Sequence, residues 1–123
     1  EVVIVAGADA AGRLGGGAIA DLVGRCPGAV LGLATGSSPL PVYADLARRH
    51  AAGELSLASA RAFLLDEYVG LPPDHPQRYR AFIARELERH VDFAPGAVQA
   101  PDVRADGPAL LDACAACEPT LTA

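Results

Sequence analysis

The sequence has no lysine, methionine, tryptophan or asparagine, and cysteine is scarce. The three cysteines, Cys26, Cys114 and Cys117, form an odd set, so we predict no disulfide framework. Cys114 and Cys117 have the spacing of a redox pair, but they lie in an alanine-rich stretch. We interpret them as small helix residues of a protein in the reducing cytosol. A zinc site would need a second cysteine pair or nearby histidines, so no metal is predicted.

Basic charge is also scarce. The chain carries 10 basic residues, all arginine, against 15 acidic ones, and its net charge is -5. With no basic stripe, we expect no nucleic-acid partner. No apolar run approaches the length of a membrane span, and no stretch resembles a signal peptide, so we expect a cytoplasmic protein without a membrane partner. A composition of 51% hydrophobic and 20% charged residues is typical of a globular domain.

Strand-like and helix-like segments alternate along the chain. The patterns predict strands at 2–5, 29–34, 62–65 and 97–100, and helices at about 10–25, 39–52, 77–90 and 107–117. This alternation predicts an α/β fold of the Rossmann-like, three-layer type. We expect a mostly parallel sheet with right-handed crossovers and helices on both faces. Residues 1–123 are interpreted as a single domain, or the first part of one.

Individual residues predict where the first two helices begin. Asp9 and Ser38 are predicted to cap the first and second helices, with Pro39 in the first turn of the second. The glycines at 15–17 match neither a P-loop nor a dinucleotide fingerprint. We interpret them as part of a weak helix, or of one that packs closely against the sheet. The helix at 77–90 carries six charged side chains on its remaining face, most of which are predicted to face solvent: Arg78, Arg80, Arg85, Glu86, Glu88 and Arg89.

Two predicted strands end in polar residues. The run at 29–34 leads into Thr35, Gly36, Ser37 and Ser38, directly before a helix. Small residues, hydroxyls and free backbone N–H groups at a helix N-terminus suit a bound phosphate, although an ordinary capping turn is the alternative.

The run at 62–65 breaks into two carboxylates, Asp66 and Glu67, and then into a loop rich in glycine and proline. Ligands of open α/β sheets bind outside the carboxyl ends of the strands, so Asp66 is well placed for proton transfer. The alternative is a structural carboxylate that caps the next turn. His75, in the same loop, has no partner at ligand spacing and is assigned to no metal.

The segments 31–43, 65–72 and 75–79 together resemble glucosamine-6-phosphate deaminase, and the resemblance runs from Val2 to about Glu118. It implies conversion of glucosamine 6-phosphate and water to fructose 6-phosphate and ammonia, without a cofactor, in the catabolism of N-acetylglucosamine and other amino sugars. It also implies that Asp66 is the base that moves a proton between C2 and C1 of the open-chain sugar.

The same resemblance implies that Thr35, Gly36, Ser37 and Ser38 hold the substrate phosphate and that Glu67 supports the site. Family members continue to a ring-opening segment with an Asp-Gly-His core, which these residues lack. We therefore expect an N-terminal portion of the family's domain. Members often form oligomers, so a homo-oligomer is left open.

Two other functions stay open. A 6-phosphogluconolactonase-like hydrolase shares the Gly/Ser/Thr-Pro loop, but such enzymes usually have Asp-Glu-Arg where this chain has Asp66, Glu67 and Tyr68. The third possibility is a module that binds a sugar phosphate without catalysis.

Overall fold

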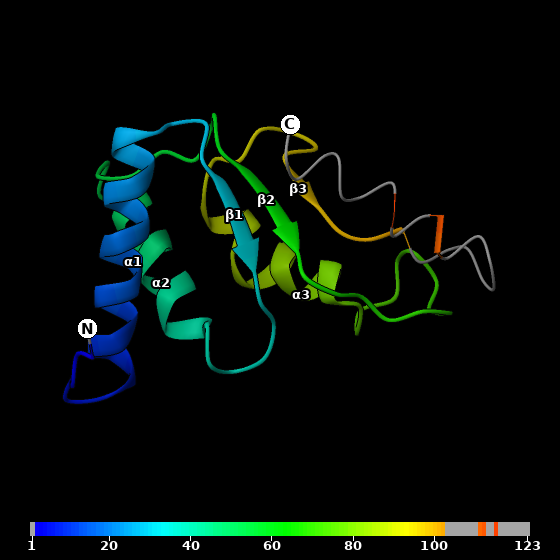
Figure 1. The fold of residues 1–123 in the computed structure, drawn as a ribbon, viewed down its shortest axis with the longest axis horizontal. Helices are drawn as coiled ribbons and strands as arrows, with labels where there is room; N and C mark the ends of the chain where they lie inside the picture. The colour runs from blue at the N-terminus through cyan, green and yellow to red at the C-terminus, as the bar shows by residue number, and fades with distance from the viewer. Residues whose placement is uncertain (1, 103–110, 113–114, 116–123) are drawn as a thin grey trace.

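The computed structural model describes residues 2–102, 111–112 and 115. Its centre is a parallel three-stranded sheet in the order β1-β2-β3 (Figure 1). The strands are β1 (Val30–Leu33), β2 (Arg61–Leu64) and β3 (Val98–Gln99). The helices are α1 (Ala8–Arg25), α2 (Leu40–Ala51), α3 (Tyr79–Glu86) and the short 3-10 helix η1 (Glu88–His90). The predicted α/β class and parallel sheet are confirmed.

Both crossover helices cover one face of the sheet. The strands are neighbours in chain order, so both connections cross the sheet in the same direction. Because such connections between parallel strands are right-handed, α2 and α3 lie on the same side of the sheet. The buried core lies there, where alternate strand residues pack against α2 and α3; it includes Leu31, Leu33, Tyr43, Leu46, Ala62, Leu64, Ile83, Leu87 and Val98. On the opposite face Val30 is 40% exposed. Within the described residues, α2 and α3 supply one of the two predicted helical layers.

α1 packs against α2 at a separation that depends on glycine. A Cβ atom on Gly12 would lie 2.5 Å from the carbonyl oxygen of Pro41, and one on Gly16 would collide with the Asp45 carboxylate. Asp45 is buried and forms an ion pair of 2.6 Å with Arg49. The glycine-rich helix therefore packs closely, as predicted, but its neighbour is α2 and not the sheet.

The predicted first strand is wrong. Residues 2–5 form no strand, and the side chains of Val2 and Ile4 are 91% and 94% exposed. In Figure 1 this segment lies beside the start of α1, away from the three strands. β-branched residues favour extended backbone, but a strand also needs a neighbour to pair with, and the described sheet offers none at this position.

Helix ends also differ from the predictions. The N-cap residues of α1 and α2 are Gly7 and Pro39, without a side-chain cap, so the predicted caps Asp9 and Ser38 are wrong. The helix predicted at 77–90 is shorter and continues as η1. The last predicted helix, with Cys114 and Cys117, falls largely outside the described residues. No helix in the described part is long and apolar enough to cross a membrane.

Candidate active site

The two predicted site segments leave the sheet at the same edge. The register pairs Leu33 of β1 with Leu64 of β2, so Thr35 and Asp66 each lie two residues beyond a paired position. Figure 1 shows both connecting segments leaving from the arrowhead ends of these strands. Adjacent strands are about 4.8 Å apart. The sheet therefore places the predicted phosphate loop beside the predicted base.

The loop after β1 is open to solvent. Thr35 is half-buried, whereas Gly36, Ser37 and Ser38 are exposed. Gly36 has φ +91°, a left-handed conformation that favours glycine. The loop closes into α2 through a hydrogen bond of 3.3 Å from the Leu40 N–H to the Ser37 carbonyl. Its polar groups are thus accessible to a ligand.

One buried side chain anchors the start of this loop. The Tyr43 hydroxyl, on α2, donates a hydrogen bond of 2.5 Å to the carbonyl of Ala34. Burial raises the pKa of Tyr43, although the bond to Ala34 acts in the opposite direction. The phenol stays protonated at neutral pH and holds the carboxyl end of β1 against α2.

The neighbouring carboxylates Asp66 and Glu67 lie in opposite surroundings. Asp66 is exposed, whereas the Glu67 side chain is fully buried. Glu67 Oε1 accepts hydrogen bonds from the backbone N–H groups of Tyr68 (2.9 Å) and Tyr79 (2.8 Å). Its Oε2 accepts one from the N–H of Arg80, also at 2.9 Å. Glu67 therefore satisfies free N–H groups in the first turn of α3, and the capping role considered for Asp66 belongs to Glu67.

Glu67 also faces a buried cation. The Nε atom of Arg78 lies 3.3 Å from Glu67 Oε2, and the Arg78 side chain is 10% exposed. Burial acts to raise the pKa of Glu67, but the backbone hydrogen bonds and the charge of Arg78 outweigh it and lower the pKa. The guanidinium also donates to the carbonyl of Pro73 at 3.2 Å. Arg78 is therefore not part of the solvated face predicted for most charged side chains of this helix.

A cavity of about 570 Å³ opens between the two loops. It is lined by Thr35, Gly36, Tyr68, Pro76, Gln77, Tyr79, Phe82 and Arg85. The structure thus joins part of the predicted phosphate loop to aromatic residues, while Ser37, Ser38 and Asp66 lie outside this lining. The sequence pattern marks neither tyrosine as a site residue, because Tyr79 lies within the helix predicted at 77–90 and the only signal for Tyr68 is its place after the carboxylate pair.

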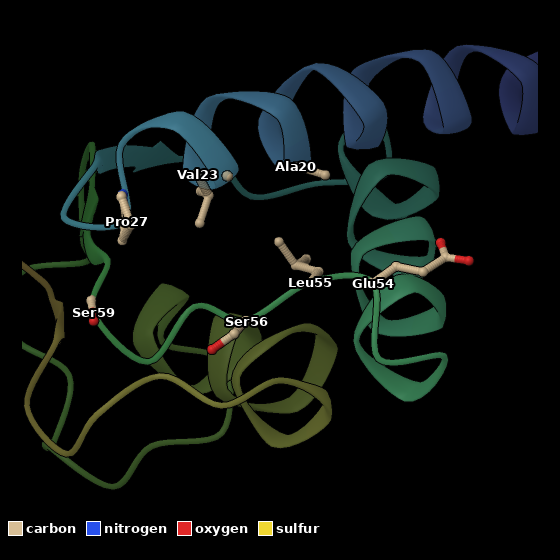
Figure 2. A pocket seen from close by; sticks show the side chains of 8 residues that line it. Ala20, Val23, Pro27, Glu54, Leu55, Ser56 and Ser59 are labelled. Atoms are coloured by element: carbon tan, nitrogen blue, oxygen red, sulfur yellow. The ribbon is translucent and has the colours of Figure 1, made fainter.

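A second cavity, of about 240 Å³, lies at the opposite edge of the sheet (Figure 2). Pro27 and Ser59, which precede β1 and β2, belong to its lining. The Glu54 carboxylate points away from it in Figure 2, and the Ser56 hydroxyl is already bound to Asp92 at 2.6 Å. We assign no role to this cavity. Within the described ranges, no cluster of three or more His, Cys, Asp or Glu side chains is placed to hold a metal.

Comparison with known proteins identifies relatives of the whole chain. It is 59% identical to a glucosamine-6-phosphate deaminase of Beutenbergia cavernae over 123 residues, and 55% identical to one of Mycolicibacterium smegmatis over 118 residues. These matches cover 100% and 96% of the chain, but 46% and 44% of the relatives. Over nearly its whole length the chain is thus similar to the N-terminal part of these glucosamine-6-phosphate deaminases. No protein-family model matches it.

Solved structures agree with this assignment. A monomeric glucosamine-6-phosphate deaminase superimposes with a TM-score of 0.91 at 30% identity, over 99% of this chain and 50% of that one. A 6-phosphogluconolactonase from Trypanosoma brucei gives a TM-score of 0.71 at 19% identity, over 98% and 49% of the two chains, and shares the fold. The chain thus spans about half the length of the deaminases that it resembles.

Proposed function

We propose that this chain is part of an enzyme that converts glucosamine 6-phosphate and water to fructose 6-phosphate and ammonia. The observation that carries the proposal is the placement of the Thr35 loop and Asp66 at equivalent positions of two adjacent parallel strands. The 59% identity to a curated deaminase supports the same chemistry. Because the substrate carries a phosphate and does not cross membranes freely, we also propose a cytoplasmic location.

The loop after β1 would hold the phosphate. Its small residues allow the phosphate to approach the backbone, and the hydroxyls of Thr35, Ser37 and Ser38 can donate hydrogen bonds. The following helix α2 is 12 residues long, and its N-terminus adds a favourable dipole. Clamping the phosphate would orient the far end of the sugar toward Asp66, which lowers the entropic part of the barrier.

Asp66 would then act on the open-chain sugar. Its carboxylate takes the proton from C2, which is acidified by the C1 aldehyde, and the aldehyde oxygen takes a proton from water, so that an enol forms between C1 and C2. Return of the proton from Asp66 to C1, with loss of one amine proton to water, gives an imine at C2, and water hydrolyses this imine to the ketone and ammonia. Such a transfer requires a carboxylate within about 2.6–3.2 Å of the partner that it serves. The exposure of Asp66 at the sheet edge leaves it free for this approach.

The test is a chimera of residues 1–123 followed by the C-terminal remainder of the Beutenbergia cavernae deaminase. We expect ammonia release from glucosamine 6-phosphate, and we expect Asp66→Asn to lower kcat about 10²–10⁴-fold. Wild-type turnover in Asp66→Asn would remove Asp66 from its role as the base.

The same assay separates the other functions. Faster hydrolysis of 6-phosphogluconolactone than deamination would support the lactonase-like alternative, for which the structural likeness shows the fold alone. Stabilisation by the sugar phosphate without turnover of either substrate would support a binding module. A homo-oligomer and the lack of a nucleic-acid partner stay predictions.

A further inference from the structure

Tyr68 and Tyr79 line the larger cavity, and their backbones bind the same oxygen atom of Glu67. The backbone N–H groups of Tyr68 and Tyr79 both donate to Oε1 of Glu67, at 2.9 and 2.8 Å. Their ring centroids are 4.6 Å apart, and their hydroxyls are 3.3 Å apart. Because Glu67 is fully buried, the position of the pair is set from inside the fold.

Tyr79 lies close to both site segments. Tyr79 shares the cavity lining with Thr35. The hydrogen bond to Tyr68 is the largest cause that raises the pKa of Tyr79, and the charge of Asp66 acts in the same direction. The Tyr79 phenol therefore stays protonated at neutral pH, and it lies close enough to Asp66 to sense its charge.

The two rings are accessible. Tyr68 is 48% exposed and Tyr79 is half-buried, and both line the cavity with Phe82, over whose ring the Arg85 guanidinium lies at 5.6 Å. The two hydroxyls bond to each other at 3.3 Å, a weak hydrogen bond that a ligand can replace. Sugars offer hydroxyls in series and apolar C–H faces, and a rigid aromatic wall with two hydroxyls matches both features.

We propose that Tyr68 and Tyr79 form the subsite for the carbon chain of the sugar phosphate, between the phosphate at the Thr35 loop and the reacting carbons at Asp66. The subsite rests on the proposed function for the identity of the sugar. It makes the site selective for a polyhydroxy chain over a bare phosphate, which the Thr35 loop alone would not achieve.

The test measures ligand binding by NMR and does not depend on turnover. The chain has three tyrosines and no tryptophan, so labelling all tyrosine rings with ¹³C gives three sets of NMR signals. Tyr68→Phe and Tyr79→Phe assign them, and the buried Tyr43 serves as an internal reference. Glucosamine 6-phosphate and inorganic phosphate are titrated separately, up to about ten times the 1 mM that is a common upper value of KM.

We expect glucosamine 6-phosphate to shift the signals of Tyr68 and Tyr79, and inorganic phosphate to shift only the backbone amides of the Thr35 loop. Tyr79→Phe should weaken binding of the sugar phosphate about tenfold and leave inorganic phosphate within a factor of about two. An equal loss for both ligands would show a structural role, and unmoved tyrosine signals would overturn the subsite. A chimera that releases no ammonia would refute the deaminase reaction and leave this binding result intact.

Discussion

The loops after β1 and β2 reach the same edge of the sheet but are held in different ways. Residues 34–39 are kept in place mainly by the Tyr43 hydroxyl and by the left-handed conformation of Gly36. Residues 65–78 are fixed from inside, by the buried ion pair of Glu67 and Arg78 and the backbone groups bound to it.

This difference matches the two tasks proposed for the loops. A phosphate supplies its own charge and binds to free N–H groups, so the first loop has to stay open. A base must keep its position relative to the substrate to within a fraction of an ångström, so the second loop needs a rigid support. We infer that Glu67 contributes to the site by fixing the backbone on which Asp66, Tyr68 and Tyr79 are carried.

The largest expected effect is that of Glu67→Gln. It leaves the Arg78 guanidinium buried without a counter-charge and places an amide against N–H donors, so we expect a loss of about 3–5 kcal/mol in the free energy of unfolding. Urea unfolding measures it. The matched control is Asp66→Asn, one residue away and exposed, which should change stability by no more than about 0.5 kcal/mol. Equal losses in the two variants would contradict a structural role that Glu67 has and Asp66 lacks.

Low pH should remove part of the stabilisation that the charged Glu67 provides. The pKa of Glu67 is lowered in the folded state, so the unfolded chain binds the proton more tightly. The stabilisation is fully present above the unfolded pKa of about 4.3 and is lost as the pH falls through the folded value. Asp45 and Asp92, whose pKa values are also lowered, add to this loss. We expect the free energy of unfolding, measured in urea, to change less with pH in Glu67→Gln than in Asp66→Asn. The same change with pH in both variants would argue against a charged Glu67.

The loop after β1 is anchored by Tyr43 of α2. A larger residue in the contact between α1 and α2 should therefore also disturb this loop. Gly12→Ala places a methyl group against the Pro41 backbone, and we expect a loss of about 1–3 kcal/mol in stability. The control is Gly24→Ala in the same helix, where the methyl group would meet open space and stability should hold or rise slightly. In NMR spectra, the amide of Thr35 should move more than that of Tyr79. The reverse order would show that the two loops are not supported separately.

Much of this architecture could be predicted from sequence because it rests on local pattern. The strands at Val30–Leu33 and Arg61–Leu64 are short apolar runs, and their polar ends mark Thr35 and Asp66. Parallel pairing then follows from the alternation with helices. The same reasoning was wrong for the segment 2–5, because propensity cannot supply a pairing partner.

What could not be predicted depends on contacts between distant residues. Glu67 reaches Tyr79 and Arg80, which lie 12 and 13 residues further along the chain, and nothing local marks it as the buried one of two adjacent carboxylates. Arg78 looked like one of several arginines on a helix surface, and only the fold shows that it is the cation beside Glu67. Burial of a charge is decided by tertiary structure, which the pattern of one helix does not contain.

The smallest effect is expected for Tyr43→Phe, which tests the anchor of the first loop. Removing the hydroxyl deletes the hydrogen bond to Ala34, and since Ala34 is exposed, water can take its place. We therefore expect a loss of about 0.5–1.5 kcal/mol in the free energy of unfolding. The amide signal of Thr35 should broaden or shift, whereas that of Tyr79, which is held by Glu67, should not. Tyr79→Phe removes a hydroxyl from a residue that lines the cavity and serves as the matched control for stability. If Tyr43→Phe left the Thr35 amide unchanged, the geometry of Gly36 alone would suffice to hold the loop.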